Sequence, residues 1–204
     1  MIFYLIALSV LAYYFTVMFP VLYKKEKQNV IQQCGVLVED RSEPGRHTLL
    51  AIVMFIMPVA IFSFSENMLL SSFCFILAVA AYTDLSSRWI PDIAIYTLLV
   101  LSMLSLHKSD LIPSLWSVLL YLFPALFISA YGLLVKKKSL IATGDYYVIP
   151  SIGVMVLPEH ASGLMLANFI IVIAISHWIQ KIPLVTVAYF SFTGYQLCLN
   201  SGLL

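Results

Sequence analysis

Apolar residues follow one another in long runs along this chain, and short polar breaks separate the runs. A run of about 20 apolar residues is long enough to cross the hydrocarbon core of a bilayer as a helix. The polar breaks divide the chain into eight apolar segments, at residues 2–23, 49–64, 68–83, 93–106, 115–135, 146–158, 161–180 and 182–199. The pattern predicts an all-α, polytopic membrane helical bundle that forms a single membrane-embedded domain over residues 1–204.

The segment at residues 146–158 is shorter than a full crossing requires. If it does cross, ten of the eleven Lys and Arg residues fall on one side of the membrane and only Lys108 falls on the other. Because basic residues concentrate in cytoplasmic loops, that side is the cytoplasm. If the segment does not cross, Lys181 moves outside. We therefore predict eight crossings with both termini outside, and the sequence leaves open whether residues 146–158 cross fully.

The composition narrows the class of protein further. Of the 204 residues, 62% are hydrophobic and 10% are charged, whereas about a quarter of a soluble domain is charged. This excludes a soluble enzyme, a disordered tail and a secreted disulfide scaffold. The formal net charge is +1 without a long basic run, so the expected surroundings are a lipid bilayer and not nucleic acid.

Neither a metal nor a cofactor is predicted. Cys34, Cys74 and Cys198 are isolated, and no Cys-x-x-Cys or His-Glu-x-x-His pattern occurs. The one sizeable polar stretch, residues 24–47, is therefore expected to be a short cytoplasmic loop without a zinc motif.

Two carboxylates stand at the ends of apolar segments. Asp84 ends the third segment and Asp145 precedes the sixth. Two crossings separate them, so both lie at the cytoplasmic membrane boundary. Two close carboxylates can share one proton and serve as acid and base, which is what peptide hydrolysis without a covalent intermediate needs. We predict that Asp84 and Asp145 are catalytic, and that Gly144 lets the backbone approach a substrate strand closely.

Other interpretations of these residues stay open. Asp84 could be a charge at a helix end that pairs with Arg88, and Asp145 could be a helix N-cap. In a different class of function, the two carboxylates would bind a cation in a membrane ion or proton carrier, although carriers usually place such groups near the midplane.

The sequence around each aspartate resembles a known family. The stretch Asp84-Leu-Ser-Ser-Arg-Trp-Ile-Pro-Asp92 looks like the first aspartate motif of the type IV prepilin peptidases, and Ala142-Thr-Gly-Asp145 is similar to their Gly-x-Gly-Asp motif. The basic first loop, the eight apolar segments and the Lys181-Ile-Pro183 start of the last segment also fit.

The resemblance implies an intramembrane aspartic endopeptidase in the bacterial inner membrane. Its substrate would be a type IV prepilin or pseudopilin precursor, from which it removes a basic leader on the cytoplasmic side, usually after a glycine. Asp84 and Asp145 match the catalytic pair, and the family needs no metal there. Asp92 either caps the fourth segment or joins Gly144 in binding the substrate, as part of an acidic mouth for the leader.

The chain departs from the family pattern at three places. Ala142 replaces the first glycine of the second motif, and Tyr147 stands where a lysine is often found. The first loop lacks the paired Cys-x-x-Cys motifs of the larger members, which also N-methylate the product. The sequence therefore leaves N-methyltransferase activity open.

Overall fold

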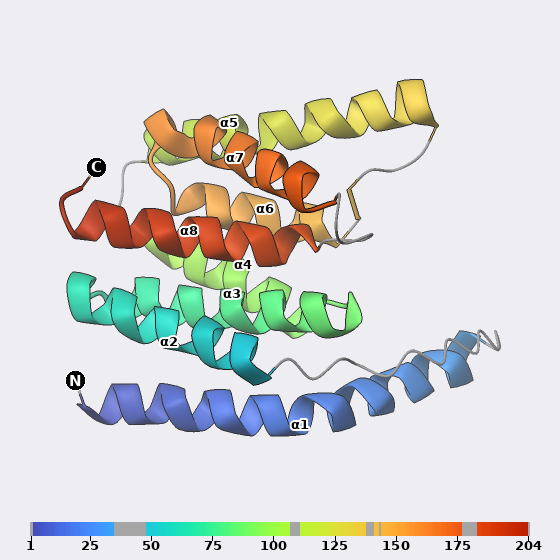
Figure 1. Cartoon of the computed structure of the whole chain (residues 1–204), viewed down its shortest axis with the longest axis vertical. Coiled ribbons are helices and arrows are strands. Elements are labelled where there is room, and N and C mark those ends of the chain that lie inside the picture. The colour runs from blue at the N-terminus through green and yellow to red at the C-terminus, as the bar shows by residue number, and fades with distance from the viewer. Residues whose placement is uncertain are drawn as a thin grey trace.

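The structure is a bundle of helices that run roughly side by side (Figure 1). This computed structural model describes residues 2–34, 48–106, 111–137, 141–142, 144–176 and 183–203. The helices are α1 (Ile2–Cys34), α2 (Thr48–Ser65), α3 (Met68–Ser87), α4 (Asp92–Leu106), α5 (Leu111–Tyr131), the π-helical extension η1 (Gly132–Lys136), α6 (Asp145–Val154), α7 (Pro158–Ser176) and α8 (Leu184–Asn200). The described residues contain no strand, which confirms the all-α prediction.

Five of these helices are long and apolar enough to cross a membrane: α1, α2, α3, α5 with its extension, and α7. Each of the eight α-helices corresponds to one predicted apolar segment. The chain changes direction at every connection, so the two termini lie at the same end of the bundle (Figure 1). The polytopic membrane architecture predicted from the sequence is therefore confirmed.

The first helix is longer than predicted. It continues past Tyr23 to Cys34, so the first part of the polar stretch at residues 24–47 is helical. Residues 24–34 contain neither Gly nor Pro and are rich in Lys and Gln, which favour helix. The rest of the predicted loop, residues 35–47, lies outside the described residues.

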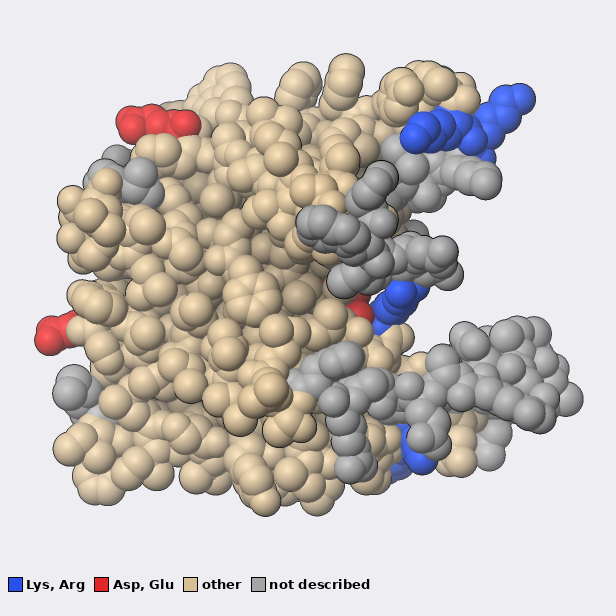
Figure 2. All heavy atoms as spheres, in the orientation of Figure 1, with Lys and Arg blue, Asp and Glu red and all other residues tan. Residues whose placement is uncertain are grey.

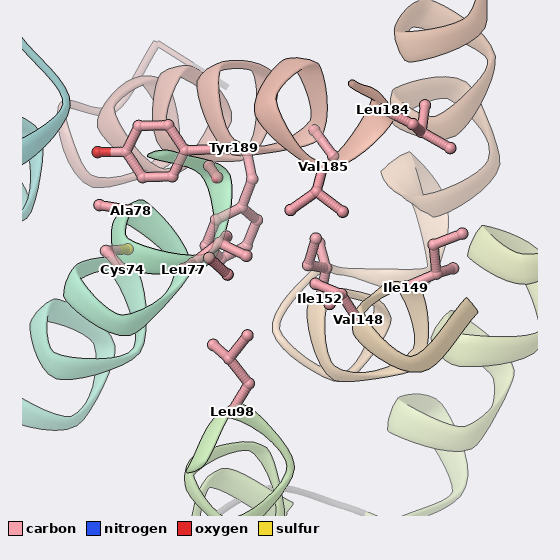
Figure 3. Close-up of a cluster of buried hydrophobic side chains, with 14 of the residues drawn as sticks. Cys74, Leu77, Ala78, Leu98, Val148, Ile149, Ile152, Leu184, Val185 and Tyr189 are labelled. Atoms are coloured by element: carbon pink, nitrogen blue, oxygen red, sulfur yellow. The ribbon is translucent and has the colours of Figure 1, made fainter. Parts of the chain in front are cut away.

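Helix α3 forms the centre of the bundle. It packs against α2, α4 and α8, and nearly every side chain from Leu70 to Asp84 is buried. Small residues such as Ala78, Ala80 and Ala81 let neighbouring helices approach its backbone closely. Apolar side chains of α3, α4, α6 and α8 meet in one cluster, in which Leu77, Leu98, Ile152 and Val185 point toward one another (Figure 3). This cluster fixes α6 and α8 beside α3.

Helix α6 is much shorter than its neighbours. Its ten residues span about 15 Å, which is half of a hydrocarbon core of about 30 Å. Its far end is held by side chains of two other helices: the Ser117 hydroxyl of α5 donates to the Gly153 carbonyl at 2.8 Å, and the Gln196 amide of α8 donates to the Met155 carbonyl at 2.9 Å. Because that end is anchored and the helix is short, its first residue, Asp145, is buried inside the bundle.

Charged side chains divide between the two ends of the bundle. Lys and Arg gather at one end, with some acidic surface among them, and acidic side chains alone mark the opposite end (Figure 2). The described basic side chains belong to the second half of α1, the α3–α4 connection and η1, and they are Lys24, Lys25, Arg88, Lys136 and Lys137. We call this the basic end. The exposed Glu66 and Glu159 lie at the opposite end, at the start of α3 and α7. The other basic positions, Arg41, Arg46, Lys108, Lys138, Lys181 and the side chain of Lys27, lie outside the described residues.

Candidate active site

Asp84 lies in the last turn of α3, at the basic end of the bundle. Its side chain is 7% exposed. The helix stops four residues later because Arg88 adopts the left-handed conformation (φ 55°), and the Arg88 N–H donates to the Asp84 carbonyl at 2.8 Å. This reversal turns the chain toward Pro91 and α4. The backbone conformation of Arg88 therefore ends the helix, and the Asp84 carboxyl group stays buried in the bundle.

Asp145 is the first residue of α6 and is 5% exposed. Its backbone N–H donates to the Ala142 carbonyl at 3.1 Å, which closes the turn before the helix. Gly144 occupies the N-cap position, and no side chain caps the helix there. The alternative role of Asp145 as an N-cap is therefore not the one that the structure shows.

The structure brings Asp84 and Asp145 together. The charge of the Asp145 carboxylate acts on that of Asp84, and the Arg88 guanidinium acts on it in the opposite sense. The two carboxyl groups come from helices that share α4 and α8 as neighbours. The charge of Arg88 therefore acts on Asp84, as the alternative interpretation of Asp84 as a helix-end charge paired with Arg88 also predicts.

A third element reaches Asp84, and the sequence did not predict it. The backbone N–H groups of Val185 and Thr186, at the start of α8, lie within hydrogen-bonding range of the Asp84 carboxyl group. The Asp84 Oδ2 atom is nevertheless buried without a hydrogen-bond partner among the described residues. Backbone N–H groups cannot be recognised in a sequence motif. The one signal of them in the sequence was Pro183, because it precedes the last helix and has no side chain that could cap it.

The two predicted substrate-binding residues occupy different settings. Gly144 has an ordinary right-handed conformation (φ −62°), and an added Cβ would be 3.8 Å from the nearest atom, Ile90 Cδ1. The fold itself therefore does not require glycine at this position. Asp92 is exposed in the first turn of α4, where a negative charge suits the helix dipole, and none of the described interactions joins it to the aspartate pair.

Two hollows of the described structure lie elsewhere. One, of about 640 Å³, runs between α1 and α2 and has Ala12, Ala51 and Tyr82 among its lining residues; a second, of about 350 Å³, lies at the far end of α6. Neither is lined by a predicted site residue. Within the described ranges, no three His, Cys, Asp or Glu side chains gather as metal ligands would.

The fold and the site define a polytopic helical membrane protein with two buried aspartates whose charges interact near one end of the bundle. The family model described as "Type IV leader peptidase family" matches residues 71–177, a stretch that includes both Asp84 and Asp145. The chain belongs to the type IV leader peptidase family. It has no significant match among curated proteins or among solved structures.

Proposed function

We propose that this membrane peptidase is an aspartic endopeptidase that removes the basic leader from type IV pilin-like precursors, with Asp84 and Asp145 as its catalytic pair. The observation that carries the proposal is that two buried carboxyl groups, 61 residues apart in the chain, lie near enough for their charges to interact. Burying two acidic groups side by side is costly for a fold, so a chemical role explains the arrangement better than a structural one.

The pair supplies both proton transfers that peptide hydrolysis needs. Two carboxyl groups whose charges interact in this way can hold one proton between them, because like charges at short range do not both ionise easily. The ionised group takes a proton from water as that water attacks the scissile carbonyl. The protonated group gives its proton to the departing nitrogen. The group that took a proton from water now holds the single proton of the pair, so the pair again has one protonated and one ionised member.

The unpartnered Asp84 Oδ2 atom fits this chemistry. A buried carboxylate oxygen without a partner is uncommon and calls for an explanation. An attacking water or the substrate's own peptide group would complete its hydrogen bonding. Asp84 thereby has an oxygen available to the reaction.

The location of the pair supports cleavage on the cytoplasmic side. Both aspartates lie toward the basic end, and basic residues mark the cytoplasmic face of membrane proteins. The exposed Asp92 begins α4 at the same end, where its charge would attract a basic leader. The bacterial inner membrane is the compartment in which such a precursor meets this face.

The carrier hypothesis fits the site less well. Asp84 lies in the last turn of its helix, whereas carriers usually place ion-binding carboxylates near the midplane. Membership in a peptidase family also favours hydrolysis.

The proposal is tested by replacing each aspartate with asparagine and following the conversion of a pilin-like precursor by gel mobility. We expect Asp84→Asn and Asp145→Asn each to lower processing by at least about a hundredfold, because neither amide can exchange a proton. Glu159→Gln removes a carboxylate at the opposite end and should process the precursor normally. Normal processing by both aspartate variants would show that the pair is not catalytic.

A further inference from the structure

Helix α8 begins without a cap of its own. Its N-cap residue is Pro183, which makes no side-chain capping bond. A helix normally satisfies its first free N–H groups through a Ser, Thr, Asp or Asn side chain at the N-cap, which accepts from the second or third helical residue. In α8 those residues are Val185 and Thr186. Their N–H groups therefore depend on an acceptor from elsewhere in the bundle.

The carboxyl group of Asp84 is the acceptor that faces these N–H groups. It lies within hydrogen-bonding range of the Val185 and Thr186 N–H groups, the same two positions that a local cap would serve. Asp84 is more than nine-tenths buried, and its Oδ2 has no partner among the described residues. A carboxylate from α3 thus occupies the place of a missing cap on α8, where the helix dipole also favours negative charge.

A second bond fixes the distance between the two helices. The Thr186 hydroxyl donates to the Ala81 carbonyl at 2.9 Å, and both residues are buried. Ala81 lies three residues before Asp84, on the neighbouring turn of the same face of α3. The Thr186 side chain therefore holds the start of α8 against the turn of α3 that carries Asp84. The charged groups that act on Asp84 there are Asp145 and Arg88.

We propose that the start of α8 is a positioning device for the reaction: its N–H groups hold the Asp84 carboxyl group, and Thr186 is the positioning residue that keeps them there. This inference rests on the proposed function, since it assigns Asp84 to catalysis. The absence of a capping side chain at Pro183 is part of the device, because a local cap would compete with Asp84 for the same N–H groups.

The test uses the full-length protein and a pilin-like precursor, with kcat and KM measured separately. Thr186→Val keeps the shape of the side chain and removes the hydroxyl, and we expect it to lower kcat by about tenfold with KM unchanged. Thr186→Ser restores the donor and should recover most of that loss. Thr193→Val is the matched control, because Thr193 is also buried in α8 but its hydroxyl bonds only to carbonyls of its own helix.

A second variant addresses the cap directly. Pro183→Ser gives α8 its own acceptor, so the N–H groups should leave Asp84 and kcat should fall by about tenfold, while the protein accumulates in the membrane as wild type does. Wild-type kcat in both Thr186→Val and Pro183→Ser would overturn the inference. An equal loss in Thr193→Val would do so as well, because a structural effect would then suffice. In either case the inactivity of Asp84→Asn would still support the proposed function.

Discussion

Gly144 and Gly153 differ in how closely neighbouring atoms approach them. An added Cβ at Gly153 would come within 3.0 Å of Val118 Cα and 3.3 Å of Tyr121 Cβ, so α6 packs onto α5 at this point. At Gly144, next to Asp145, the nearest atom would be 3.8 Å away. The packing of the fold therefore requires glycine at position 153 and does not require it at position 144.

This contrast predicts opposite effects for two alanine substitutions. Gly153→Ala should lower the free energy of unfolding by about 1–3 kcal/mol, because backbone on both sides of the contact must move. Gly144→Ala should leave stability unchanged and reduce processing, because we propose that the substrate strand approaches the backbone at this glycine. Thermal unfolding in detergent and precursor processing, measured on the same preparations, separate the two effects. A destabilised Gly144→Ala variant would mean that the glycine is structural.

At this scale the sequence predicted the acidic residues and missed their backbone partners. Asp84 and Asp145 were visible because a charge in an apolar chain needs a reason. The N–H groups of Val185 and Thr186 carry no comparable signal, since every residue except proline has one. Their role follows only from the approach of α8 to α3, which depends on the packing of side chains around Leu77 and Val185.

At the scale of the elements, a proline in one helix is compensated by a tyrosine in another. Pro58 of α2 has no N–H, so the Met54 carbonyl one turn earlier loses its usual helical partner. The Tyr189 hydroxyl of α8 donates to that carbonyl instead. The Pro58 carbonyl in turn accepts from the Ser71 hydroxyl of α3 at 2.9 Å. The proline thus ties α2 to both neighbouring helices.

Removing the tyrosine hydroxyl should therefore destabilise the bundle. We expect Tyr189→Phe to lower the free energy of unfolding by about 1 kcal/mol, as for other hydrogen bonds between membrane helices. The loss should be smaller in a Pro58→Ala background, because the alanine N–H can bond to Met54. Chemical unfolding of the four proteins of this cycle gives the coupling. Equal losses in both backgrounds would show that the tyrosine does not compensate for the proline.

The apolar pattern of the sequence did not predict every helix length. The apolar runs located the eight α-helices, but they did not give the length of α1, whose polar residues 24–34 are helical, or the end of α6, which is Val154 and not residue 158. Polar residues continue a helix as readily as apolar ones when no Gly or Pro intervenes. The depth of α6 depends on bonds from Ser117 and Gln196, which join residues far apart in the chain.

At the scale of the whole molecule, the distribution of charge predicts how the bundle is oriented in the membrane. The described Lys and Arg side chains gather at one end of the bundle (Figure 2), and the end of α3 and the start of α6 place the aspartate pair toward the same end. This agrees with the count over the full sequence, in which ten of eleven basic residues fall on one side if the chain crosses eight times. An even number of alternating helices also places both termini together (Figure 1).

Reporter fusions test this orientation. Fusions after Arg41 and Lys137 should report a cytoplasmic location, and one after Lys108 an outside location, because positive charge is retained on the cytoplasmic side. The measurement is the activity of reporters that work on only one side of the membrane. A reversed pattern would place the aspartate pair on the outer side and would rule out cytoplasmic cleavage.

The central claim is that Asp84 and Asp145 act as one catalytic unit, and a cycle of variants measures this most directly. Processing rates are compared for wild type, Asp84→Asn, Asp145→Asn and the double variant, at matched amounts of purified protein. If the two share one proton, either substitution removes the whole function, and the double variant is no slower than the single ones. Losses that multiply in the double variant, or a single variant that retains the wild-type rate, would contradict a shared catalytic pair.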